Sequence, residues 1–194
     1  MQKYIFLDFD GVLNSHQHVL EILESEALRG EKGPRGVNPG EAADPIFEAD
    51  VRAIVYNLDP RNLWNLKFLL KSVPDLRIVL STTWRLRHSM GVLKEALRRC
   101  GIHPDCVVGK TPKKMSSSRA DEIGLYLADE LGVRRGNKND VMWRTLDDKN
   151  IFLLNDPFKE NEHKTDQLVG LTYRDALDLI YYFNPEFKQP VILM

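Results

Sequence analysis

Asp8 and Asp10 are separated by a single residue at the end of an apolar stretch, and a glycine follows them at position 11. Residues 3–9 have the pattern of a buried strand, in which side chains two residues apart point the same way. Two like charges held that close are unfavourable unless a cation or a shared proton compensates for them. The pair therefore favours a metal site over a surface turn, the other structure for which an Asp–Gly sequence is typical.

The chemistry open to such a pair includes metal binding and phosphoryl transfer. Carboxylate oxygens suit Mg²⁺, which keeps several waters and shares phosphate oxygens. Asp8 could also attack phosphorus and form an aspartyl-phosphate, while Asp10 protonates the leaving oxygen and then activates water. Ser81, after a second apolar run, is a neutral donor for a phosphoryl oxygen. The cation that this chemistry requires could come from Arg119, at the start of a predicted helix, or from Lys110 in the preceding loop.

Strands that alternate with helices must position these residues. The predicted strands span residues 3–9, 76–80, 106–108 and 151–154, and the predicted helices span 16–29, 62–70, 89–99, 119–131 and a segment after residue 172. Ser118 and Thr172 are the expected N-caps of the last two helices. This alternation predicts an α/β fold, a Rossmann-like parallel sheet flanked by helices.

Two apolar stretches compete for the last core strand. Residues 141–146 precede Asp147 and Asp148, and residues 151–154 precede Asp156. Both cannot be central parallel strands, because parallel neighbours need a crossover of about a dozen residues. The uninterrupted second stretch suits a strand buried on both faces, whereas the first contains an arginine. We therefore expect 151–154 to be the core strand, 141–146 to be a strand or arm that feeds it, and Asp156 to be a metal ligand.

Ligands of parallel α/β sheets bind outside the carboxyl ends of the strands. Three predicted strand ends carry groups that can do chemistry, namely Asp8 with Asp10, Ser81 with Thr82, and Asp156. Because parallel strands end at the same edge of a sheet, these side chains should converge there. This convergence is the strongest argument from the sequence for a functional site.

Residues 14–58 look like an insertion after the first strand. Residues 30–45 within it are rich in glycine and proline, and a compact domain does not normally carry so long a loop unless the loop is functional or mobile. We expect residues 1–194 to form a single domain that carries residues 14–58 as a flap or small cap. Such a short cap would leave the site open to a large substrate, or could close over a nucleotide.

The composition is that of an ordinary globular protein, with 43% hydrophobic and 28% charged residues. The net charge of −1 gives no global basic field for nucleic acid, which leaves a local patch possible. Two cysteines are too few for a disulfide framework. The first strand leaves no room for a signal peptide, and no apolar run approaches the ~18 residues of a membrane span. These features predict a cytoplasmic protein without a membrane partner.

Five segments of the chain together resemble the haloacid-dehalogenase (HAD) superfamily of phosphatases. The resemblance is closest to the branch found in RNA-repair proteins and in small phage or bacterial phosphatases. The matching segments are residues 8–14 (DFDGVLN), 80–85 (LSTTWR), 111–112 (TP), 118–123 (SRADEI) and 170–172 (GLT).

The resemblance implies a role for each motif residue. Asp8 matches the nucleophile and a metal ligand, and Asp10 matches the general acid/base, whose backbone carbonyl also meets the metal. Ser81 matches the residue that donates to the phosphate. Arg119 falls at the position of a cation that is usually lysine in the superfamily, so Lys110 is the alternative.

The fourth motif of the superfamily is usually an acidic pair that ends a strand. Asp156, preceded by an asparagine, departs from that pattern by one residue, whereas Asp147 and Asp148 match its letters but not the predicted topology. We expect the substrate to be held by the side chains of Asn14, Thr82, Arg85 and Lys110.

The resemblance implies a Mg²⁺-dependent phosphohydrolase that acts through an aspartyl-phosphate on a nucleotide or on the terminal phosphate of a nucleic acid. The alternative is a protein that binds a phosphorylated ligand on the same scaffold without turnover.

Overall fold

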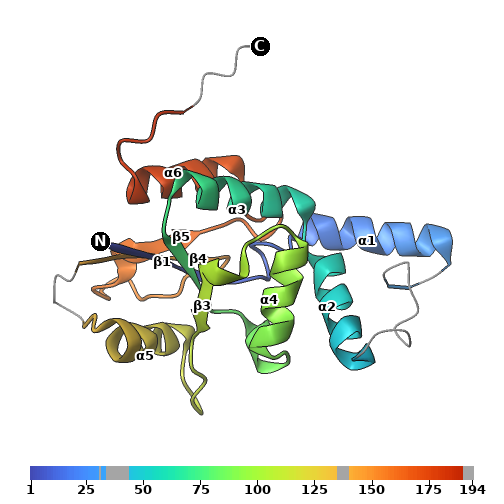
Figure 1. Ribbon diagram of the computed structural model, residues 1–194, viewed down its shortest axis with the longest axis horizontal. Helices are drawn as coiled ribbons and strands as arrows, with labels where there is room; N and C mark the ends of the chain where they lie inside the picture. Colours follow the sequence, from blue (N-terminus) through green and yellow to red (C-terminus); the bar gives the residue numbers. More distant parts are fainter. Residues whose placement is uncertain (31, 34–43, 135–139, 190–194) are drawn as a thin grey trace.

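A computed structural model describes residues 1–30, 32–33, 44–134 and 140–189. Its centre is a sheet of five strands in the order β3-β2-β1-β4-β5, in which every neighbouring pair is parallel (Figure 1). The strands are β1 (Gln2–Leu7), β2 (Leu76–Leu80), β3 (Val107–Lys110), β4 (Val141–Asp147) and β5 (Glu162–Lys164). This arrangement confirms the predicted Rossmann-like α/β fold.

Helices connect the strands and cover the sheet. They are α1 (His16–Arg29), α2 (Pro45–Asn57), α3 (Pro60–Ser72), α4 (Met90–Arg99), α5 (Arg119–Leu131) and α6 (Tyr173–Phe183). Ser118 and Thr172 are N-caps, as predicted, and each belongs to a capping box in which the aspartate at N3 bonds back to the cap. Within the described residues, no helix is both long and apolar enough to cross a membrane.

The two faces of the sheet support two apolar cores, because side chains alternate along each strand. Ile5 and Leu7 of β1 belong to the larger core, which also contains residues of α2, α3, α4 and α6. Tyr4 and Phe6 point to the opposite face and belong to a smaller core with residues of α5. Figure 1 shows α3 and α6 side by side, where they pack on each other.

The prediction of residues 151–154 as the core strand is wrong. β4 is the strand that pairs with β1, with Leu146 opposite Leu7, and residues 151–154 lie in the turns that connect β4 to β5. The chain reaches β4 from β3 through α5, and residues 148–161 form the crossover from β4 to its parallel neighbour β5.

Arg144, the residue that argued against this strand, is half-buried in the middle of β4, opposite Ile5 of β1. Its guanidinium lies 3.9 Å from the centroid of the Tyr182 ring and donates to the carbonyl of Glu160. A cation over an aromatic face needs little water, so a half-buried arginine does not exclude a core strand.

The segment proposed as an insertion contains α1 and α2. Val51 and Ile54 of α2 are buried in the larger core, whereas α1 buries no residue. Its two ends are joined where the Ser15 hydroxyl donates to Asp59, at 2.9 Å. Most of the predicted loop 30–45 lies outside the described residues, and the description of the segment as a flap or small cap stays a prediction.

A matched pair of leucine variants tests the corrected strand. Leu146 of β4 is fully buried, whereas Leu154 in the following turns is 93% exposed. We expect Leu146→Ala to lower the free energy of unfolding by about 2–5 kcal/mol through loss of apolar burial and a residual cavity. Leu154→Ala should change it by less than about 0.5 kcal/mol. Urea denaturation measures both, and a larger loss for Leu154→Ala would contradict the assignment of β4.

Candidate active site

Asp8 stands directly after β1 and is almost fully buried. Its backbone N–H donates to the carbonyl of Leu146 at 2.9 Å, so β1 and β4 are still paired where the aspartate begins. Its carboxylate accepts a hydrogen bond from the Phe9 N–H at 2.7 Å and is hydrogen-bonded by the side chain of Thr82. Burial raises the pKa of Asp8, which the nearby Arg119 opposes.

Gly11 makes room for the acidic pair at the end of β4. Its φ of 70° lies in the left-handed region, and a Cβ added there would lie 2.5 Å from the Cβ of Asp148. The turn is held by the Thr165 hydroxyl, which donates to the Gly11 carbonyl at 2.8 Å. A glycine at position 11 is therefore required for Asp148 to lie against the turn that follows Asp8.

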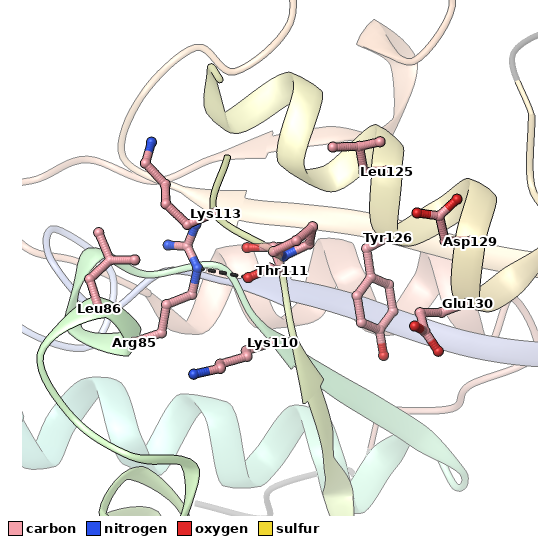
Figure 2. A pocket seen from close by; sticks show the side chains of 10 residues that line it. Arg85, Leu86, Lys110, Thr111, Lys113, Leu125, Tyr126, Asp129 and Glu130 are labelled. Atoms are coloured by element: carbon pink, nitrogen blue, oxygen red, sulfur yellow. Dashed lines mark hydrogen bonds between the residues drawn. The ribbon is translucent and has the colours of Figure 1, made fainter. Parts of the chain in front are cut away.

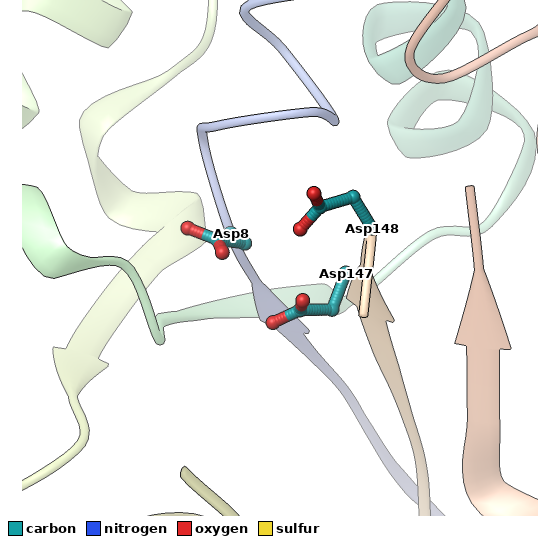
Figure 3. Close-up of side chains that lie close together, drawn as sticks. All are labelled: Asp8, Asp147 and Asp148. Atoms are coloured by element: carbon teal, nitrogen blue, oxygen red, sulfur yellow. The ribbon is translucent and has the colours of Figure 1, made fainter. Parts of the chain in front are cut away.

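Asp8, Asp147 and Asp148 form an acidic cluster. Each offers a carboxylate oxygen, and these atoms lie within 4.8 Å of one another. Figure 3 shows Asp8 beside the other two, at the ends of the neighbouring strands β1 and β4. Burial and then the charge of Asp8 raise the pKa of Asp147 to about 7, and the charge of Arg119 opposes this shift.

The donor set of this cluster fits Mg²⁺. All its potential ligands are carboxylate oxygens, which hard divalent cations prefer. The Oδ1 atom of Asp148 is buried and has no hydrogen-bond partner, which leaves a ligand atom available. Asp8, Asp147 and Asp148 are therefore the residues that could hold the metal.

Arg119 is the cation that the structure brings to the cluster. Its Nη1 lies 2.5 Å from Oδ2 of Asp8 and 2.6 Å from Oδ2 of Asp147. Arg119 is the first residue of α5, so the capping box that begins this helix also sets the position of its side chain. Lys110, the alternative, lines a neighbouring cavity instead.

Ser81 follows β2 at the same edge of the sheet. It is 1% exposed, and its hydroxyl has no hydrogen-bond partner. Its N–H donates to the carbonyl of Leu7, the residue before Asp8, at 2.8 Å. An unpaired buried hydroxyl is costly unless a ligand satisfies it, so Ser81 is suited to donate to a bound group.

Asp10 is exposed, yet several donors orient its carboxylate. The indole Nε1 of Trp84 lies 3.0 Å from both oxygens, and the Thr83 hydroxyl donates at 3.3 Å. The Asn14 amide donates at 3.4 Å, so the predicted substrate contact of Asn14 competes with a contact to Asp10. The Trp84 ring also packs edge-on against Phe9. The Asp10 carboxylate is therefore accessible to solvent, while its hydrogen bonds fix its orientation.

Arg85 is committed to partners within the protein. Its guanidinium pairs with the buried carboxylate of Glu122 and donates to the carbonyls of Thr82 and Thr111. Thr82 is itself buried beside Asp8. These contacts link the loop after β2 to α5, and direct substrate contacts of Arg85 and Thr82 stay predictions.

Asp156 does not belong to the acidic cluster. It lies in the turns after β4, and its Oδ1 accepts a hydrogen bond from the Phe158 N–H at 2.9 Å. Its expected place beside Asp8 depended on the strand 151–154, which the fold does not contain. The available signal was the acidic pair Asp147–Asp148 at the end of an apolar run.

The fold and the site define the class of protein. A Rossmann-like α/β domain with carboxylates gathered at the ends of its central strands is typical of the HAD superfamily, whose domains are generally hydrolytic, mostly phosphatases, and typically use Mg²⁺. The family model of the HAD domain in Swiss Army Knife RNA repair proteins matches residues 4–176, and the chain belongs to this family. Neither a curated protein nor a solved structure matches the chain.

Two aspartate variants test the composition of the metal site. We expect Asp148→Asn to weaken Mg²⁺ binding at least about tenfold, because a neutral amide replaces a charged oxygen ligand. Asp156→Asn should leave the dissociation constant within about twofold, because its carboxylate serves a turn. Isothermal titration with MgCl₂ measures both constants. The reverse order of effects would show that Asp156 is the ligand.

A second matched pair tests the structural role of Arg85. Arg85→Met leaves the Glu122 carboxylate buried without its main cation, and we expect a loss of about 3–5 kcal/mol in the free energy of unfolding. The same change at Arg98, whose side chain is 56% exposed, should cost less than about 1 kcal/mol. Thermal and urea denaturation measure the difference. Equal stabilities would indicate that Arg85 is not needed for the fold.

Proposed function

We propose that this protein is a Mg²⁺-dependent phosphohydrolase that acts through an aspartyl-phosphate on a nucleotide or on the terminal phosphate of a nucleic acid. The observation that carries the proposal is the position of the Asp8 carboxylate, buried at the end of the central strand in contact with Arg119 and beside a second acidic pair. The phosphohydrolase type of the family supports it.

The proposed reaction has two steps on Asp8. In the first, a carboxylate oxygen of Asp8 attacks phosphorus, the bond from phosphorus to the leaving oxygen breaks, and Asp10 gives that oxygen a proton. In the second, Asp10 takes a proton from a water that attacks the same phosphorus, and the Asp8 carboxylate is released with inorganic phosphate. The hydrogen bonds from Trp84 and Thr83 would hold Asp10 in one direction for both transfers.

Arg119 and Ser81 would bind the phosphoryl oxygens. The guanidinium of Arg119 carries donors in a fixed geometry that suits phosphate, and it already lies against the nucleophile. The unpaired hydroxyl of Ser81 would gain a partner when phosphate binds. Both groups are buried or half-buried, so their interactions with developing charge would be stronger than in water.

Asp8, Asp147 and Asp148 would hold the Mg²⁺ ion. When bound, the ion offsets the repulsion between the carboxylates and the phosphate and stabilises charge on the transferring group. Burial and the charge of Asp8 raise the pKa of Asp147 to about 7, and a bound cation would favour its ionised form.

The substrate class is inferred from the family and from the exposure of the site. The family is described from RNA-repair proteins, which suggests a phosphorylated nucleic acid, and a terminal 3′-phosphate is the leading candidate. Asp10, the group that would meet the leaving oxygen, is exposed to solvent. An exposed general acid is compatible with a leaving group as large as a polynucleotide.

Hydrolysis of p-nitrophenyl phosphate with and without Mg²⁺ tests the reaction. We expect Mg²⁺-dependent turnover, and a loss of at least about 10³-fold in Asp8→Asn, because an amide cannot serve as the nucleophile. Asp105→Asn, at an aspartate whose side chain is 89% exposed, is the matched control and should keep full activity.

The outcomes separate the two candidate functions. Turnover that survives Asp8→Asn would exclude Asp8 as the nucleophile. If the wild-type protein hydrolyses neither p-nitrophenyl phosphate nor a 3′-phosphorylated oligonucleotide but binds the latter tightly, the protein binds phosphorylated ligands without turnover.

A further inference from the structure

A cavity of about 250 Å³ lies next to the candidate active site, between the end of β3 and one side of α5. Its lining comes from the loop after β2, from residues 110–113 at the end of β3, and from α5 (Figure 2). None of the catalytic or metal-binding residues assigned above lines it. The cavity is therefore a separate feature of the same sheet edge.

A chain of hydrogen bonds links this cavity to the nucleophile. Asp8 is hydrogen-bonded by the side chain of Thr82, and the carbonyl of Thr82 accepts from the guanidinium of Arg85. Arg85 also donates to the carbonyl of Thr111 at 3.0 Å, and both Arg85 and Thr111 line the cavity. The Arg85 side of the cavity is thus the side that faces the active site.

The two ends of the cavity carry side chains of opposite charge. Figure 2 shows Arg85 and Lys110 on one side of Thr111, and Asp129 and Glu130 of α5 on the other. Lys110 makes no ion pair with any residue that the structure describes, and Glu122 already balances Arg85. The cationic end suits a phosphate, and the acidic end suits a group that donates hydrogen bonds.

The middle of the cavity offers an aromatic wall and an unsatisfied hydroxyl. Tyr126 can lie against β3 because position 109 is glycine, where an added Cβ would lie 2.5 Å from the tyrosine hydroxyl. Thr111 is 2% exposed, and its Oγ1 has no hydrogen-bond partner. A buried polar atom without a partner, in the lining of a cavity, points to a ligand that satisfies it.

We propose that this cavity binds the nucleoside that carries the scissile phosphate. The sugar lies near Lys110 and the Thr111 hydroxyl, and the base lies along Tyr126 with its donor edge toward Asp129 and Glu130. This orientation keeps the phosphate toward Arg85 and hence toward Asp8. The assignment rests on the proposed phosphatase function, and it adds a binding site for the base and a preference among bases.

The acidic end of the cavity sets that preference. Carboxylates only accept hydrogen bonds, so they favour bases that present amino groups. Guanine, adenine and cytosine carry an exocyclic amino group, whereas thymine presents acceptor oxygens there, as does uracil. We expect guanosine 3′-phosphate to be a better substrate and a tighter ligand than uridine 3′-phosphate.

The test compares nucleotides with p-nitrophenyl phosphate, which carries no nucleoside. In Asp129→Asn/Glu130→Gln, and separately in Lys110→Ala, kcat/KM for guanosine 3′-phosphate should fall about tenfold more than kcat/KM for p-nitrophenyl phosphate, because charge-assisted hydrogen bonds are lost. The acidic-end variant should also lose the preference for guanosine over uridine. Asp178→Asn and Lys71→Ala, at exposed residues of α6 and α3, are the matched controls and should leave both ratios unchanged.

Binding measurements keep this proposal separate from the proposed catalysis. The dissociation constants of both nucleoside 3′-phosphates are measured by titration calorimetry with the wild-type protein and the same variants. Equal kcat/KM losses on all substrates, with unchanged nucleotide binding, would overturn the nucleoside site while leaving the phosphatase intact. If the wild-type protein shows no turnover but binds guanosine 3′-phosphate, and the variants weaken that binding about tenfold, the nucleoside site is supported and the phosphatase function is rejected.

Discussion

The structure depends on holding like charges together at one edge of a parallel sheet. Asp8 and Asp147 are nearly fully buried at the ends of adjacent strands, which is unfavourable without positive charge between them. Arg119 supplies part of that charge from the first turn of α5. The pairing of β1 with β4, the glycine at position 11 and the capping box of α5 can each be understood as a means of bringing these three groups together.

The loop after β2 connects this acidic centre to the rest of the edge. Thr82 and Trp84 contact Asp8 and Asp10 respectively, and Arg85, three residues after Thr82, pairs with Glu122 of α5. One short segment therefore orients the nucleophile and the acid/base and also joins them to the helix that carries Arg119. This connection explains why the neighbouring cavity faces the active site, since its lining shares the same arginine.

Much of the fold and part of the site could be predicted from local patterns. The parallel α/β class and the N-caps at Ser118 and Thr172 follow from short-range sequence. The convergence of Asp8 with Ser81 then follows from that class, because parallel strands end at the same edge of a sheet. The identity of the last core strand could not be predicted in this way. A half-buried arginine argued against residues 141–146, and nothing local revealed that Tyr182, 38 positions after Arg144, would cover it.

By itself, the sequence determined the chemistry of the central strand, because residues adjacent in the chain stay adjacent in any fold. Because Asp8 and Asp10 directly follow an apolar run, they place two carboxylates at the end of the strand that this run forms. Only the tertiary structure decided that Asp147 and Asp148 meet Asp8 and that Asp156 does not. The reason is physical: a ligand set assembled from separate strands depends on which strands pair, and strand pairing is a long-range choice made by burial and hydrogen bonding across the whole sheet.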